Sequence, residues 1–159
     1  MACGAGFLAI AASRAGFDAT GLDSSDFMIE EANRCAKEAG VDVRFVPGDA
    51  ASVPFEDGSF DCVIIRNSLW AFFDPVKALK EASRVLRKDG VLMIIDNEWV
   101  AKLSGKELGP DDDGKPTYSG EQGFGGTDVI DPVFRSLPLS AENRPDWDRQ
   151  ELARLGMTV

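Results

Sequence analysis

Two acidic residues follow strand-like segments in the first third of the chain, and a glycine-rich turn precedes both. Asp23 ends one segment, Asp49 ends the next, and the turn is Gly4-Ala5-Gly6. A carboxylate can accept hydrogen bonds from both hydroxyls of a ribose diol, or from the amino edge of adenine. Glycines in a turn let a ligand approach the backbone amides. Because the carboxyl ends of parallel strands meet at one sheet edge, these residues predict a nucleoside pocket on an open α/β sheet.

Helices and strands alternate along the part of the sequence that must position these residues. Helical spacing and end signals predict helices over 7–15, 26–39, 75–88 and 145–155, and apolar runs predict strands over 18–22, 41–46, 60–65 and 91–95. The last two strands are almost entirely apolar, which is typical of strands covered on both faces. The alternation predicts a mostly parallel, Rossmann-like sheet with helices on both faces.

The composition excludes several classes of function. The chain has 159 residues, of which 44% are hydrophobic, and a net charge of −10, which argues against nucleic acid as a partner. It has no histidine and three widely spaced cysteines, so we expect no metal site and reduced, cytoplasmic thiols. The apolar run 7–12 is too short for a secretion signal, and no run is long enough to span a membrane.

Several short motifs, in their order along the chain, are typical of one known family. They are Ala2-Cys3-Gly4-Ala5-Gly6, Asp23-x-Ser25-x-x-Met28, Gly48-Asp49-Ala50, the segment 54–61, Arg66-Asn67 and the segment 84–90. Together they resemble the class I S-adenosylmethionine-dependent methyltransferases, in the small-molecule, methyltransferase type 11-like subgroup. The resemblance covers residues 2–99. It implies S-adenosylmethionine as the cofactor and a small molecule as the methyl acceptor, and the lack of a long apolar run predicts no membrane partner.

The resemblance also implies a role for each residue of the pocket. The amides around Gly4 and Gly6 would face the carboxylate of the cofactor. Asp23 would accept from the ribose hydroxyls, and Asp49 from the adenine amino group, while the Ala50 amide donates to the ring. Purely structural roles are the alternatives: the two glycines could form an ordinary tight turn, and Asp23 and Asp49 could each cap a following helix.

Four further residues are expected around the same pocket. Ser24 and Met28 would line its ribose and adenine side, with core packing as the alternative for Met28. Arg66 and Asn67 would lie at the amino acid end of the cofactor, with a turn or cap role as the alternative for Asn67.

Catalysis would depend mainly on positioning, because the leaving sulfide departs easily. A general base is needed where the acceptor carries a proton. In the absence of histidine, the candidates are Asp96 or Glu98, a tyrosine, or water; surface or capping roles for the two carboxylates stay open. Both residues follow the strand 91–95, at the edge where ligands bind in such sheets.

Aromatic residues could form the wall that receives the methyl acceptor. Trp70 and Trp99 are the candidates, since an aromatic face suits an apolar acceptor and a sulfonium cation. For Phe72 and Phe73, packing in the core is favoured.

The sequence departs from the family pattern at both ends. The first strand, which the family places centrally between the strands of Asp23 and Cys62, is missing, and so are the last strands. Ala2 stands where the first glycine of the motif would be. The two strands beside the missing one must pair with each other, or another chain must fill the position, or the sequence is a fragment of a longer gene product. Unpaired strand edges favour association, so we expect self-association through the incomplete sheet.

Two regions and three functional hypotheses follow. Residues 1–100 would form the incomplete cofactor-binding core, and residues 101–159 a variable acceptor-side segment with a long loop at 108–126 and a last helix. A methyltransferase is favoured. A non-catalytic remnant or association module is the alternative, and a nicotinamide-dependent oxidoreductase is the second alternative, since Gly4-x-Gly6-x-x-Ala9 followed by Asp23 would also fit that class.

Overall fold

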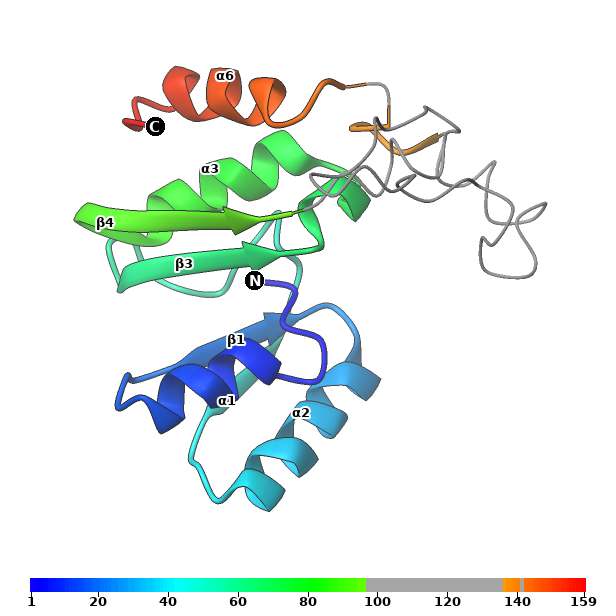
Figure 1. The fold of residues 1–159 in the computed structure, drawn as a ribbon, viewed down its shortest axis with the longest axis vertical. Coiled ribbons are helices and arrows are strands. Elements are labelled where there is room, and N and C mark those ends of the chain that lie inside the picture. Colours follow the sequence, from blue (N-terminus) through cyan, green and yellow to red (C-terminus); the bar gives the residue numbers. More distant parts are fainter. Residues whose placement is uncertain (97–135, 141) are drawn as a thin grey trace, which may run out of the picture.

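The computed structural model describes residues 1–96, 136–140 and 142–159 as an α/β fold (Figure 1). The elements in chain order are α1 (Phe7–Arg14), β1 (Thr20–Asp23), α2 (Asp26–Ala39), β2 (Arg44–Pro47), β3 (Phe60–Arg66), the short 3-10 helix η1 (Leu69–Ala71), α3 (Pro75–Val85), β4 (Leu86–Ile95) and α6 (Asp146–Arg154). The predicted alternation is confirmed. The loop predicted at 108–126 lies outside the described residues.

Helix ends follow the local signals in the sequence. Ser25 is the N-cap of α2 and accepts a hydrogen bond from the N–H of Met28. Asp74 caps α3 in the same way, ahead of Pro75 at its first turn. Gly40 ends α2 in the left-handed conformation, at φ 66°.

The strands form two parallel pairs. β1 pairs with β2, and β3 pairs with β4, but no ladder joins β1 to β3. Figure 1 shows α1 and α2 beside the first pair and α3 beside the second, with α6 beyond α3. The four strands therefore form two separate two-stranded sheets, and the break between the sheets lies between β1 and β3.

The amino-terminal residues lie between the two pairs of strands. The amino group of Met1 donates to the carbonyl of Ile64 in β3 at 2.8 Å. The N–H of Cys3 donates to the carbonyl of Leu22 in β1 at 2.9 Å. Residues 1–3 thus bond to both neighbours at the carboxyl ends of the strands, and the neighbours do not close up (Figure 1).

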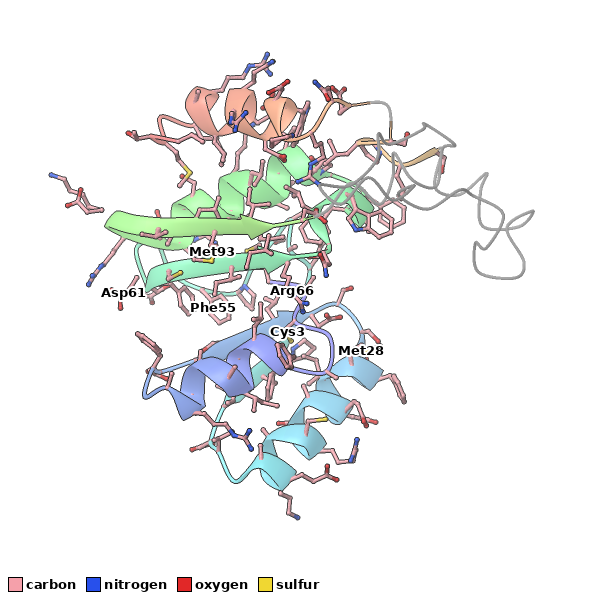
Figure 2. The ribbon with its side chains drawn as sticks, in the orientation of Figure 1. Cys3, Met28, Phe55, Asp61, Arg66 and Met93 are labelled. Atoms are coloured by element: carbon pink, nitrogen blue, oxygen red, sulfur yellow. The ribbon has the colours of Figure 1, made fainter. Side chains whose placement is uncertain are left out.

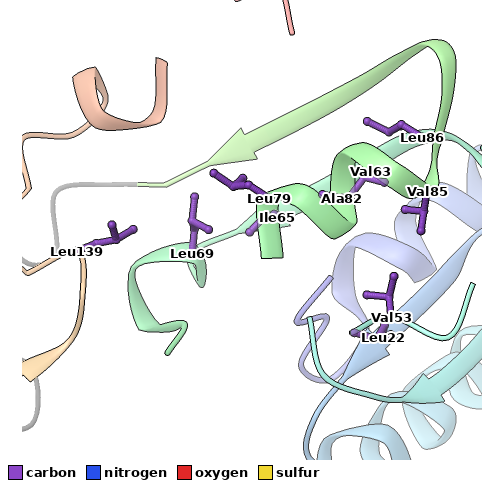
Figure 3. Packing of buried hydrophobic residues seen from close by; sticks show 10 residues of the cluster. All are labelled: Leu22, Val53, Val63, Ile65, Leu69, Leu79, Ala82, Val85, Leu86 and Leu139. Carbon is purple, nitrogen blue, oxygen red and sulfur yellow. The ribbon is translucent and has the colours of Figure 1, made fainter. Parts of the chain in front are cut away.

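One hydrophobic core nevertheless connects the two halves (Figure 3). Ile65, Leu69 and Leu79 are fully buried on the β3 and α3 side. Leu22 of β1 and Val53 belong to the same cluster of buried side chains. Side-chain packing therefore holds β1 against the second half of the molecule where backbone pairing is missing.

Two predictions about the second pair of strands are wrong. The strands are not covered on both faces: Val91 is 54% exposed, Met93 44% and Ile95 41%, because no described element packs over that face. The helix predicted to reach residue 88 ends at Val85, since Leu86 pairs with Phe60 and begins β4.

Helix α6 is attached to the end of β4 by a buried ion-pair network. Arg144 contacts Asp96 at 2.6 Å and Asp148 at 2.8 Å, and these three side chains are 15%, 9% and 10% exposed. Within the described residues, no helix is both long and apolar enough to cross a bilayer.

Candidate functional site

Asp23 connects the glycine turn, β1 and the start of α2. It is the last residue of β1 and only partly buried. One carboxylate oxygen accepts from the N–H of Gly4 at 2.8 Å, and the other accepts from the N–H of Ser25 at 3.0 Å. Each carboxylate oxygen has two lone pairs, so both retain acceptor capacity for a ligand. The N-cap of α2 is Ser25, which leaves Asp23 free of that role.

The glycine turn has open space at one position and close packing at the other. Gly4 has φ +53°, and a Cβ placed there would meet nothing within 4 Å. Gly6 has φ +82°, and a Cβ there would lie 2.7 Å from the ring of Phe45. Gly6 is therefore needed for its left-handed backbone conformation and for the close packing of the Phe45 ring, whereas the space beside Gly4 stays open.

Asp49 lies at the same sheet edge as Asp23. Asp23 pairs with Pro47 in the parallel register, and the N–H of Gly48 donates to the carbonyl of Asp23 at 2.8 Å. Asp49 is exposed, and one of its carboxylate oxygens accepts from the N–H of Ala51 at 2.8 Å. This contact stabilises a turn, and no helix begins between β2 and β3, so the helix-cap alternative is wrong for Asp49, while its adenine role stays a prediction. Ala50 is buried.

The start of α2 places the next two predicted residues beside Asp23. Ser24 follows Asp23 directly and is exposed. Met28 is 37% exposed and contributes no buried core contact, so the alternative of core packing is not supported. Figure 2 shows Met28, Cys3 and Arg66 toward the carboxyl ends of the strands, the side where the glycine turn lies.

Arg66 and Asn67 approach this region from the end of β3. The guanidinium of Arg66 lies 5.7 Å from the centroid of the Phe7 ring, at the start of α1. Asn67 has φ 51°, a left-handed conformation that asparagine tolerates, and its carbonyl accepts from the indole N–H of Trp70 at 3.1 Å. The turn role of Asn67 is thus present, and both side chains remain exposed.

Sequence reasoning missed two residues near the end of β3. Phe7 is 69% exposed and carries the contact with Arg66. Ser68 has a buried hydroxyl with no hydrogen-bond partner among the described residues. An unpaired buried hydroxyl is unfavourable, and a polar ligand atom would relieve that cost. No pattern in the sequence distinguishes Ser68 from an ordinary turn serine.

Asp96 is held by a residue that the sequence did not suggest. Arg144, far along the chain, donates to it from the segment before α6. The ion pair with Arg144 gives Asp96 a structural role, which is to hold the segment before α6 at the end of β4. Its role as a base remains a prediction. Glu98 and Trp99 lie outside the described residues.

The aromatic residues near η1 differ in burial. Trp70 is partly buried in η1, and Phe72 packs against the core. The core prediction is wrong for Phe73, which is 92% exposed because η1 has already ended.

Burial and Asp23 together set the electrostatics at the turn. Burial raises the pKa of the Cys3 thiol, and the negative charge of Asp23 raises it further. Burial lowers the pKa of the Met1 amino group. All three cysteines are free. Among the described residues, no group of three potential ligands is placed to hold a metal ion.

The arrangement can bind a nucleoside with an anionic end. An acidic side chain lies at the end of each of two paired parallel strands, and an open glycine turn leads into the first turn of α1. Backbone N–H groups at a helix start favour a carboxylate or another anion. The fold and these residues define an α/β core with a candidate nucleoside site at its carboxyl edge.

The family follows from the comparison with known proteins. Residues 1–94 match the model of a family described as a methyltransferase domain. The chain belongs to this methyltransferase domain family. The match covers the residues around Asp23, Asp49 and Arg66, and it stops near the end of β4.

Individual relatives agree with this assignment. The chain is 40% identical over 98 residues to the uncharacterized methyltransferase YcgJ of Bacillus subtilis. This alignment covers 61% of this chain and 39% of YcgJ. The solved YcgJ structure has a TM-score of 0.58 over 70% of this chain and 44% of that one. A demethylmenaquinone methyltransferase of Thermus thermophilus is 38% identical over 98 residues, 60% of this chain and 44% of that protein. The chain thus spans less than half the length of these relatives.

One solved structure with the same fold has a different reaction. The [4+2]-cyclase SpnF is 34% identical, with a TM-score of 0.56 over 58% of this chain and 35% of that chain. The fold therefore does not by itself determine the reaction, and function must be argued from the site.

Proposed function

We propose that this chain forms the S-adenosylmethionine-binding core of a methyltransferase that acts on a small molecule. The observation that carries the proposal is the position of Asp23, whose two carboxylate oxygens join the open glycine turn to the start of α2. A carboxylate fixed in this way is preorganised to receive a cis-diol beside a turn that can face an anion. Membership of the methyltransferase domain family supports the choice of cofactor.

The described residues divide the binding work along the sheet edge. Asp23 would hold the ribose and Asp49 the adenine, with Ser24, Met28 and Ala50 around them. The open space above Gly4 fits a ligand that approaches the amides of the turn.

Arg66 and Asn67, at the end of β3, would bind the amino acid end, next to Ser68, whose buried hydroxyl has no partner in the described part of the chain. S-adenosylmethionine, when bound, supplies an activated methyl group. The protein must then orient the acceptor, and such positioning is worth roughly 7–11 kcal/mol of the barrier.

The methyl acceptor and the base are the less defined parts of the proposal. Trp70 and Trp99 are the proposed acceptor wall, and Asp96 or Glu98 the proposed base, with Asp96 held by Arg144. The net charge of −10 favours a small molecule over nucleic acid as the acceptor. Free cysteines favour a cytoplasmic location.

Titration calorimetry with two cofactors tests this function. We expect the full chain to bind S-adenosylhomocysteine and not NAD. Asp23→Asn should weaken that binding, whereas Asp18→Asn, an exposed acid before the same strand, should not. Binding of NAD alone would favour the oxidoreductase hypothesis. Binding of neither ligand by a folded chain would favour the non-catalytic hypothesis.

A further inference from the structure

Two short sequence motifs that lie outside the candidate site contact each other in the structure. They are the segment 54–61, between β2 and β3, and the segment 84–90, which begins near the end of α3. The guanidinium of Arg84 donates to the carbonyl of Phe55 at 2.9 Å and to the carboxylate of Asp57 at 2.7 Å. These contacts attach the connection between β2 and β3 to the helix of the second half of the molecule.

Glu81 and Arg84 lie about one turn apart on α3, and together they hold the backbone of Val53. Nε and Nη2 of Arg84 donate to the two carboxylate oxygens of Glu81, both at 2.8 Å. The N–H of Val53 donates to Glu81 at 2.9 Å, and the carbonyl of Val53 accepts from Arg84 at 3.2 Å. A bidentate pair of this kind fixes the orientation of both side chains. Both backbone polar groups of a buried residue are therefore satisfied by one ion pair.

Hydrogen bonds connect Asp49 to the residue that this ion pair holds. The carbonyl of Asp49 accepts from the N–H of Ser52 at 3.0 Å, and its carboxylate accepts from the N–H of Ala51 at 2.8 Å. Ser52 directly precedes Val53. The turn that orients the Asp49 carboxylate thus ends next to the point where the ion pair holds the chain.

Packing connects the two ends of the same segment. Gly48 directly precedes Asp49, and Pro54 directly follows Val53. A Cβ added at Gly48 would lie 3.4 Å from Cδ of Pro54 and 3.1 Å from Cδ1 of Leu22, so the segment folds back onto its own beginning. Val53 and Leu22 also belong to the shared core cluster (Figure 3). The position of Asp49 is therefore determined from outside its own turn.

We propose that Glu81 and Arg84 are a positioning pair for the nucleobase side of the site, which hold the segment of Asp49 so that its carboxylate can distinguish adenine from other purines. The inference rests on the proposed function, in which Asp49 accepts from the adenine amino group. Asp49 follows β2 in the first half of the molecule, whereas the pair lies on α3 in the second half. No described ladder joins the two pairs of strands, so the ion pair supplies an alignment that backbone pairing does not.

The recognition of the base should be more sensitive to this pair than the fold is. A hydrogen bond weakens steeply when its acceptor moves out of line. Asp49 is exposed, and the bond from Ala51 keeps its carboxylate oriented only relative to its own turn. If the pair on α3 is weakened, the turn can move as a unit, and the contact with the base is lost while the turn itself persists.

Titration calorimetry with S-adenosylhomocysteine and S-inosylhomocysteine tests the proposal, because a carbonyl replaces the adenine amino group in the second ligand. For the wild-type chain we expect about tenfold tighter binding of the adenine ligand. Arg84→Lys keeps the charge but loses the bidentate geometry, so this preference should fall to about twofold or less. A purely structural role would lower the melting temperature and leave the ratio of the two dissociation constants unchanged.

Two further variants make the comparison specific. Glu81→Gln is the milder change, since its amide oxygen can still accept from Val53, and it should lower the preference even if Arg84→Lys does not fold. Arg34→Lys is the matched control: Arg34 pairs with Glu31 at the same i,i+3 spacing, and in the described part of the chain its hydrogen bonds stay within α2. The control should keep the wild-type preference. An unchanged preference in both α3 variants, or an equal loss in the control, would overturn the proposal.

Amide hydrogen exchange without ligand separates this inference from the proposed function. Arg84→Lys should make the N–H groups of Ala51 and Ser52 exchange about tenfold faster, because their turn is held less firmly. The N–H of Gly48, which donates to Asp23 of β1, should change less. Unchanged exchange at Ala51 and Ser52 would overturn the positioning role alone. Faster exchange in a folded chain that binds neither ligand would overturn the proposed function, and with it the adenine role of the pair.

Discussion

The carboxylate of Asp23 and the backbone N–H of Gly4 are joined by a 2.8 Å hydrogen bond. The bond links the end of β1 to the glycine turn, across 19 residues of sequence. The acid that would hold a ribose therefore also determines the position of the turn that would face the anionic end of the same ligand. A change at Asp23 should affect both functions at once.

Replacing Asp23 by Asn should weaken S-adenosylhomocysteine binding by about 10- to 100-fold, which corresponds to the ~1.5–3 kcal/mol of hydrogen bonds to a charged group. The melting temperature should also fall slightly, because the amide retains only one acceptor oxygen for the two N–H donors. Calorimetry measures the first effect and thermal denaturation the second. In the Asp18→Asn control both quantities should stay unchanged, and equal losses in the two variants would contradict the assignment.

Cys3 and Cys62 should differ in reactivity toward alkylating reagents. Cys62 is exposed, whereas burial and then the charge of Asp23 raise the pKa of Cys3. Iodoacetamide at pH 8 should therefore label Cys62 first, because only the thiolate reacts. The rate for Cys3 should rise at higher pH than for an ordinary cysteine thiol, and Asp23→Asn should move that rise to lower pH. Peptide mass mapping across a pH series checks this order, and an unchanged Cys3 profile in the variant would refute the electrostatic explanation.

Gly21→Ala should destabilise the fold by roughly 1–3 kcal/mol through overpacking. The added Cβ would lie 2.5 Å from the ring of Phe45 and 2.9 Å from the sulfur of Cys3. Combined with Phe45→Leu, the substitution should cost less than the sum of the two single changes. Gly16→Ala is the control: at φ +89° the substitution strains the backbone, but no atom lies within 4 Å, so its cost should be additive with that of Phe45→Leu. Urea denaturation of the wild type, the three single variants and the two double variants gives the free energies of unfolding, and additivity at Gly21 would be evidence against the steric account.

Arg144→Ala should destabilise the protein by about 3–5 kcal/mol, because it removes the guanidinium that pairs with two buried carboxylates, Asp96 and Asp148. Arg149→Ala is the control. Its pair with Asp146 is 62% and 57% exposed, and exposed pairs contribute about 0–1 kcal/mol. Thermal denaturation of both variants measures the difference. Similar melting temperatures would show that α6 does not depend on this network.

Local signals predicted the elements well, whereas packing across the molecule was less predictable. Ser25, Gly40 and Pro75 mark helix ends through backbone chemistry that depends on a few neighbouring residues. The exposed face of β4 could not be predicted, since the apolar run of Val91 and its neighbours is the same whether or not another element covers it.

Long-range partners were the main omission in the candidate site. The positions of Asp23 and Asp49 at one sheet edge follow from strand order and were predictable. The contact of Arg144 with Asp96 joins residues that are 48 positions apart, and no spacing rule indicates it. Phe45 beside Gly6 and Gly21 is a similar case, because the size limit at both glycines comes from a residue of β2, distant in the sequence.

The shared cluster of Leu22 and Val53 with Val63 and Val85 has a thermodynamic consequence. Separate sheets with separate cores would melt independently, each at its own temperature. Here the loss of either half exposes apolar surface belonging to the other, so denaturation of the two halves is energetically coupled. Calorimetric scanning should accordingly record one cooperative heat-absorption peak.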